Sequence, residues 1–162
     1  NASSLATLVG RLEEGRDTVD RLQRRLAEVA DRLRNVKQSQ KVFFEVRSEP
    51  LTAAGKGSIV QQIITAAGGQ NVIRSEKAIL QYSFEALWVD DPDVYVVQRG
   101  PMSRNPQPPN RRPHFDQLRS VREGRVIFVD EYLYSRPGPR SVDAVESLAK
   151  ALYPEAFKEY TH

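Results

Sequence analysis

Hydrophobic residues follow two different rhythms along this chain, and the change between them falls near residue 40. From Ser4 to about Gln38 there is no proline, and apolar residues recur at alternating spacings of three and four, with an interruption at Gly15. This heptad pattern predicts one helix of roughly 50 Å, at about 1.5 Å per residue. The apolar positions are Leu5, Leu8, Leu12, Val19, Leu22, Leu26, Val29, Leu33 and Val36.

The apolar stripe of this helix has two interpretations. It forms either a coiled coil that makes a homodimer through residues 5–36, or a spacer packed across two globular lobes. Five heptads are enough for a coiled coil, whereas Gly10 and Gly15 weaken its first half. The pattern by itself favours neither interpretation.

After Gln40, short apolar runs alternate with amphipathic segments. The runs that predict strands buried on both faces are 41–46, 94–97 and 126–129. The segments that predict helices are 59–67, 84–89, 115–122 and 141–152, with Ser58 and Ser83 as N-caps of the first two. Segments 48–57 and 99–113 are rich in Pro or Gly and are expected to be irregular. Strands alternating with helices predict an α/β fold, a three-layer sandwich with a parallel central sheet.

Composition removes several classes of function. The 162 residues carry a net charge of +3 and no cysteine, which excludes disulfides and Cys-ligated metals. Residues 1–41 hold nine Lys/Arg against six Asp/Glu, and residues 42–162 hold fifteen of each. The basic excess therefore lies on the long helix alone. The α/β part has no basic field for a phosphate backbone, so we expect no nucleic-acid partner.

Catalytic and cofactor motifs are also missing. The two histidines, His114 and His162, are not spaced for a metal. The segment Gly55-Lys56-Gly57-Ser58 lies between a predicted strand and a helix, but it lacks the first glycine of a phosphate-binding loop. We therefore expect no cofactor, no metal site and no enzymatic activity.

Four stretches, taken in order, carry a resemblance to a known family. They are the helix running into VFFEV, then PLTAAGKGSIVQQIITAAGGQNVI, YSFEALWVDDPDVYVV and LRSVREGRVIFVDEYLYSRPGPRSVDAVESLAKALYPEAF. Together they resemble the C-terminal half of class III periplasmic substrate-binding proteins, which serve importers of cobalamin, haem and ferric siderophores. The resemblance implies that residues 1–40 are an interlobe helix and residues 41–162 the C-terminal lobe. An N-terminal lobe is then expected outside this sequence.

The resemblance also implies a function. It predicts the extracytoplasmic substrate-binding component of an ABC importer for an iron-siderophore or similar metal chelate. The family often carries aromatic residues near Leu51 and Ile79, and their absence here makes cobalamin or haem less favoured. The expected location is the periplasm or another extracytoplasmic space, with a lipid anchor on the full-length protein as one option. The alternative is a stand-alone half-size module that dimerises through its helix for signalling or scaffolding.

The expected site residues follow from the strand ends and from the resemblance. Ligands of open α/β sheets bind at the carboxyl ends of the strands. Arginines there suit the carboxylate or catecholate oxygens of an anionic chelate, and Tyr and Met side chains offer flat apolar contact. By resemblance, Glu85 docks the lobe on arginines of the membrane permease. The expected ligand-binding residues are Arg47, Glu49, Leu51, Ile79, Gln81, Arg99, Met102, Arg104, Tyr132, Tyr134 and Arg136.

Overall fold

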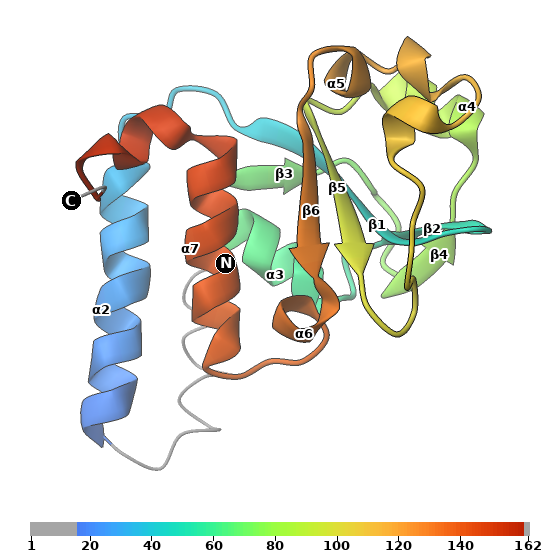
Figure 1. The fold of residues 1–162 in the computed structure, drawn as a ribbon. Helices are drawn as coiled ribbons and strands as arrows, with labels where there is room; N and C mark the ends of the chain where they lie inside the picture. The colour runs from blue at the N-terminus through green and yellow to red at the C-terminus, as the bar shows by residue number, and fades with distance from the viewer. Residues whose placement is uncertain (1–15, 161–162) are drawn as a thin grey trace.

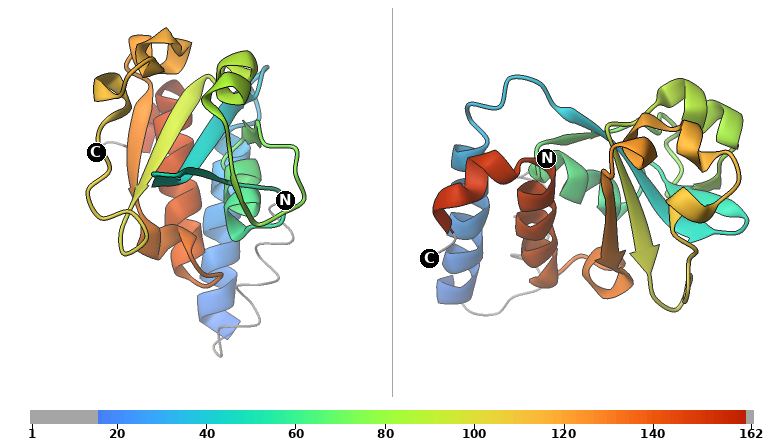
Figure 2. Two further views of the ribbon diagram at one scale, coloured as in Figure 1. Left: turned by 90° about the vertical axis from the view of Figure 1, so that its right-hand side faces the viewer. Right: turned by 45° about the horizontal axis from the view of Figure 1, so that its top comes forward.

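The short apolar runs form a sheet that is covered by helices on both faces (Figures 1 and 2). The structure is a computed structural model that describes residues 16–160. The strands are β1 (Gln40–Ser48), β2 (Leu51–Ala54), β3 (Gly69–Asn71), β4 (Ile79–Gln81), β5 (Val94–Arg99) and β6 (Val126–Asp130). The α-helices are α2 (Arg16–Arg32), α3 (Ile59–Ala66), α4 (Phe84–Asp90), α5 (Arg119–Arg122), α6 (Glu131–Tyr134) and α7 (Arg140–Leu152). The 3₁₀ helices are η1 (Pro109–Arg111), η2 (Phe115–Gln117) and η3 (Pro154–Tyr160).

The central part of the sheet is parallel, which confirms the predicted fold class. Strand order is β4-β2-β1-β5-β6, and β3 pairs with the first residues of β1. Strands β3, β1, β5 and β6 run parallel, whereas β2 and β4 add an antiparallel extension beside β1. Parallel pairing makes β1, β5 and β6 run in one direction, so that their carboxyl ends share one edge of the sheet; the arrows of β5 and β6 point downward in Figure 1.

The sheet has a hydrophobic core on each face, which explains why the sequence of β1 contains an unbroken apolar run. Successive side chains of a strand point to opposite faces. Val42 and Phe44 pack under α2, α3 and α7, and the intervening Phe43 packs with Leu87 of α4 and Val121 of α5. A strand covered on both faces needs apolar residues at consecutive positions. The predicted N-caps are also confirmed, because Ser58 Oγ accepts from Gln61 N and Ser83 Oγ accepts from Ala86 N.

Several predicted elements differ from the structure. The run 126–129 was expected to be buried on both faces, but β6 is an edge strand whose Phe128 is 37% exposed. Strands β2, β3 and β4 were not predicted. Asn71 helps to define β3, because its amide donates to Ala54 O at 3.0 Å and its Oδ1 accepts from Ile73 N at 3.1 Å. Short strands of three or four residues carry too little periodicity to be recognised.

The long helix is shorter at its C-terminal end than its pattern indicates. Helix α2 ends at Arg32 and a turn follows, so the prediction of helix to residue 38 was wrong for residues 33–38. Within the chain, Leu22, Leu26 and Val29 are buried against the core that includes α7. This part of the apolar stripe is therefore covered without a second molecule. Residues 1–15 lie outside the described residues, and dimerisation through the stripe stays a prediction. No described helix has the length and apolar character needed to cross a membrane.

Candidate functional site

Two adjoining cavities lie at the carboxyl edge of the sheet. The first, of about 370 Å³, is bounded by the start of α3, the start of β4, the end of β5 and α6, and its walls are mostly apolar. The second, of about 580 Å³, lies between α6 and the turn before α7. Glu131, Ser135 and Pro137 line both. Ligand sites in open α/β sheets lie at this edge, and an apolar cavity with a few polar groups suits a small-molecule ligand.

The first cavity depends on close packing of two backbone segments. Gly55 N donates to Ala78 O at 2.9 Å, and Lys56 N donates to Ser75 O at 2.9 Å. A Cβ added at Gly57 would lie 2.3 Å from Glu76 O, so only glycine allows this approach. The Gly-Lys-Gly-Ser segment is thus part of a packed loop that positions the start of α3.

Glu131 is a residue of this site that the sequence did not indicate. Its Oε1 accepts hydrogen bonds from Met102 N at 3.0 Å and from Gln98 Nε2 at 3.5 Å. A Cβ on Gly100 would lie 2.5 Å from the Glu131 Cβ, so Gly100 is required for this contact. Asp130 caps α6 by accepting from Tyr132 N at 3.0 Å. The only sequence signal was the acidic pair Asp130-Glu131, which spans the end of β6 and the start of α6.

The structure brings five of the predicted ligand-binding residues to the cavities. Ile79, Met102 and Tyr134 line the first cavity, and Tyr132 and Arg136 line the second. Tyr134 lines the first cavity although its side chain is buried, with its ring centroid 5.0 Å from that of Phe44. Burial raises the pKa of Tyr134, and its hydroxyl has no hydrogen-bond partner among the described residues.

The other six predicted residues line neither cavity. Arg47 and Gln81 are exposed and flank Thr52 in register across β1, β2 and β4. Arg99 is also exposed, with its guanidinium 4.9 Å from the ring centroid of Phe128. The remaining three are Glu49 and Arg104, which are exposed, and Leu51, which packs half-buried against the core around Phe43.

Unpaired basic side chains surround this edge of the sheet. Arg47, Arg104 and Arg136 are exposed, and their guanidinium groups have no ion-pair partner among the described residues. Guanidinium groups bind carboxylates and other planar oxyanions in two-point contacts. These guanidinium groups therefore suit an anionic ligand, and the exposed carboxylate of Glu49 lies at the same edge. Within residues 16–160, no group of three or more His, Cys, Asp or Glu side chains is arranged to hold a metal ion.

Glu85 lies on a separate surface. Helix α4 lies at the end of the sheet where β5 and β6 begin (Figure 1), whereas the residues that line the cavities include the last residues of β5 and those of α6. Glu85 is exposed in the first turn of α4, and Trp88 and Val89, which are 54% and 78% exposed, follow on the same helix. Residues three and four apart share one side of a helix. This surface therefore combines one carboxylate with two uncovered apolar side chains.

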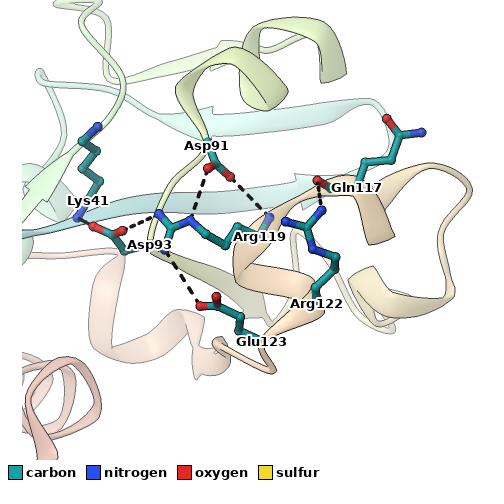
Figure 3. Close-up of polar contacts among 7 residues, drawn as sticks. All are labelled: Lys41, Asp91, Asp93, Gln117, Arg119, Arg122 and Glu123. Carbon is teal, nitrogen blue, oxygen red and sulfur yellow. Dashed lines mark hydrogen bonds and ion pairs between the residues drawn. The ribbon is translucent and has the colours of Figure 1, made fainter.

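A network of charges holds the turn after α4 (Figure 3). Arg119 bridges two acids, with Nη2 2.6 Å from Asp93 Oδ1 and Nε 3.3 Å from Asp91 Oδ2. Lys41 N also donates to Asp93 Oδ2 at 2.8 Å. Burial by itself would raise the pKa of Asp93, but the bonds from Arg119 and Lys41 outweigh it and lower the pKa. The network joins α4, α5 and the start of β1, and so fixes the orientation of α4.

An open α/β sheet with cavities at its carboxyl edge and a basic rim has the architecture of a ligand-binding lobe. A family model described as periplasmic binding protein matches residues 1–133. The chain belongs to this periplasmic binding protein family, which confirms the resemblance seen in the sequence.

Individual relatives support this assignment. The chain is 28% identical over 123 residues to an uncharacterised ABC transporter substrate-binding lipoprotein, YvrC, of Bacillus subtilis, covering 75% of this chain and 38% of that protein. Helicobacter pylori CeuE in a nickel–histidine complex has a TM-score of 0.76 at 19% identity, covering 89% of this chain and 47% of that one. The vitamin B12 binding protein BtuF of Vibrio cholerae has a TM-score of 0.69 at 22% identity, covering 86% and 53%. The chain thus spans about half or less of the length of these proteins.

Proposed function

We propose that this chain is one lobe of the extracytoplasmic substrate-binding component of an ABC importer. Membership of the periplasmic binding protein family carries the proposal, and the substrate-binding lipoprotein of B. subtilis supports it. In this role the lobe performs no catalysis. It forms one wall of a cleft that a second lobe completes, and the whole protein works outside the cytoplasm, free or lipid-anchored.

The proposed ligand is an iron-siderophore or a similar anionic metal chelate. The exposed guanidinium groups of Arg47, Arg104 and Arg136 support this class, because they suit the oxygen atoms of such a ligand. The apolar wall formed by Ile79 and Met102 would contact its less polar parts. The solved relative from a Saccharomonospora viridis Fe3+-hydroxamate transport system has a TM-score of 0.70 and is in keeping with this class.

Glu85 is proposed to dock the lobe on the membrane permease. Glu85 is exposed in the first turn of α4, and α4 lies at the end of the sheet where β5 and β6 begin (Figure 1). Arginines of the permease are the proposed partners. The exposed side chains of Trp88 and Val89 would extend the same contact with apolar area.

A thermal-shift screen of the two-lobe protein tests the ligand class. The panel contains a ferric hydroxamate, a ferric catecholate, cobalamin, haem and nickel–histidine. A ligand at 100 times its Kd stabilises the folded state by about 2.7 kcal/mol, so a true ligand raises Tm measurably. We expect a shift with a ferric siderophore and none with the isolated lobe. A shift with cobalamin or haem alone would contradict the proposed class.

A further inference from the structure

The proline-rich segment between β5 and η2, residues 100–113 (the 100–113 loop), is held at both ends by hydrogen bonds and, at its C-terminal end, by an ion pair. Its first turn is held by Glu131, which accepts from Met102 N at 3.0 Å, and by reciprocal backbone hydrogen bonds between Gly100 and Ser103. Its last turn is held by Arg112. Between these points the loop carries Arg104, one of the exposed basic groups of the rim.

The Arg112 anchor is a buried two-point ion pair with Glu45 of β1. Nη1 lies 2.5 Å from Oε1 and Nη2 lies 3.0 Å from Oε2, and the two side chains are 8% and 0% exposed. The hydroxyl of Tyr95 donates to the same Oε1 at 2.5 Å. No other ion pair between described side chains is this deeply buried.

The remaining contacts of Arg112 bind the loop to itself and to the neighbouring 3₁₀ helix. Nε donates to Gln107 O at 2.8 Å, and the guanidinium carbon lies 5.2 Å from the ring centroid of Phe115. One side chain therefore joins the middle of the loop, the central strand β1 and η2. Lysine cannot reproduce this arrangement, because it has one ammonium group instead of a planar fork of donors.

Stability alone does not account for a buried ion pair of this kind. Removing two charges from water costs about as much as their attraction returns, and apolar residues of similar volume often serve the fold equally well. In some proteins a buried pair of this kind also fixes the position of the segment that carries it. Five prolines further restrict the backbone of the loop. The ion pair and the prolines together limit the conformations that are open to the loop.

We propose that Arg112 is a positioning residue for ligand binding. It locks the 100–113 loop as a preformed wall of the cleft, and it thereby holds Met102 and Arg104 in place without touching the ligand. This inference rests on the proposed function. A ligand that meets a preformed wall does not have to order it, so the lock raises affinity.

Hydrogen exchange followed by mass spectrometry tests the lock without any ligand. Arg112→Lys should increase exchange in peptides covering residues 100–113, while exchange in β1 and α7 stays at the wild-type level. Arg122→Lys is the matched control, because exposed Arg122 also donates to a backbone carbonyl, Gln117 O, at 3.1 Å (Figure 3). The double variant Glu45→Met/Arg112→Met replaces the pair by apolar side chains, so it keeps the fold while releasing the loop. Unchanged loop exchange in both Arg112 variants would overturn the proposal.

Calorimetric titration of the two-lobe protein with ferrioxamine B, a ferric hydroxamate, tests the consequence. If the competent loop population falls to a tenth, Kd rises about tenfold. We expect this increase for Arg112→Lys and not for Arg122→Lys, at a temperature where both variants are fully folded. Faster loop exchange with unchanged affinity would overturn the positioning role. If wild-type protein does not bind ferrioxamine B, the proposed ligand class fails, while the exchange result alone decides whether Arg112 locks the loop.

Discussion

Arg25 of α2 makes a two-point contact with Glu146 of α7, with Nε 3.0 Å from Oε2 and Nη2 2.5 Å from Oε1. The hydrogen bond to Glu146 is the main cause that raises the pKa of Arg25, and it outweighs the opposing effect of burial. The same Nη2 lies 2.6 Å from Asp143 Oδ1. These contacts flank the apolar side of α2, and so they set the direction in which the helix leaves the lobe.

Replacing Glu146 should loosen α2. Glu146→Gln removes the charge from the two-point contact, and we expect the free energy of unfolding to fall by about 1 kcal/mol, the upper range for partly exposed pairs. Urea denaturation measures the change. Asp20→Asn removes a charge from an exposed position of the same helix and should have no effect. Equal stabilities for Glu146→Gln and wild type would show that Arg25 does not hold the helix.

Substitutions at two isoleucines should affect stability and ligand binding separately. Ile63 of α3 is fully buried, whereas Ile79 of β4 is 47% exposed and lines the first cavity. Ile63→Ala should lower the free energy of unfolding by about 2–5 kcal/mol, because it leaves a cavity in the core. Ile79→Ala should cost less than about 1 kcal/mol and should weaken ligand binding by the two-lobe protein. Urea denaturation and calorimetry report the two effects, and full ligand affinity in Ile79→Ala would remove this residue from the site.

Stability should decrease at alkaline pH, in part because of Tyr82. Burial, followed by the hydrogen bond that Tyr82 donates to Asp90, raises the pKa of Tyr82 to about 12. The value in the unfolded chain is about 10. The neutral hydroxyl therefore stabilises the fold fully below pH of about 10, and this contribution is lost as pH rises through about 12. Burial raises the pKa values of Tyr95 and Tyr134 too, which adds to the same trend.

Urea denaturation between pH 9 and 12 measures this loss. The decrease should be smaller in Tyr82→Phe, which has no hydroxyl to ionise at this position. Tyr132→Phe serves as the control, because that ring is 67% exposed, and its decrease should match that of wild type. A pH dependence in Tyr82→Phe as steep as in wild type would contradict the role of the Tyr82–Asp90 contact.

The parts of the fold that the sequence predicted are those that local pattern determines. Strands β1 and β5 were recognisable because both of their faces are buried, so apolar residues occupy consecutive positions in the sequence. The caps Ser58 and Ser83 were recognisable because capping is a local interaction. Strands β2, β3 and β4 depend on pairing with distant segments, and nothing in their three or four residues indicates it.

The candidate site divides in the same way. The rule that ligands bind at the carboxyl ends of strands led to the prediction of Ile79, Met102, Tyr132 and Arg136 as site residues, and these four line the cavities. The contact of Glu131 with Gly100, and the pairing of Arg112 with Glu45 across 67 positions, are tertiary contacts between residues that look unremarkable in sequence. Tyr134 shows the converse, because its position after β6 predicted only a ligand contact, whereas the one-turn helix α6 also directs its ring onto Phe44.

Glu85 should be required for transport and dispensable for ligand binding. Glu85→Arg in the full-length protein reverses the charge on the exposed first turn of α4, and like charges then face each other across the proposed contact with permease arginines. We expect uptake of the radiolabelled iron chelate by whole cells to be abolished, with the Kd of the purified protein unchanged. Glu28→Arg, a reversal at an exposed position of α2, should transport normally. Normal uptake by the Glu85→Arg protein would refute docking through this carboxylate, and parallel loss of ligand affinity would place Glu85 in the binding site instead.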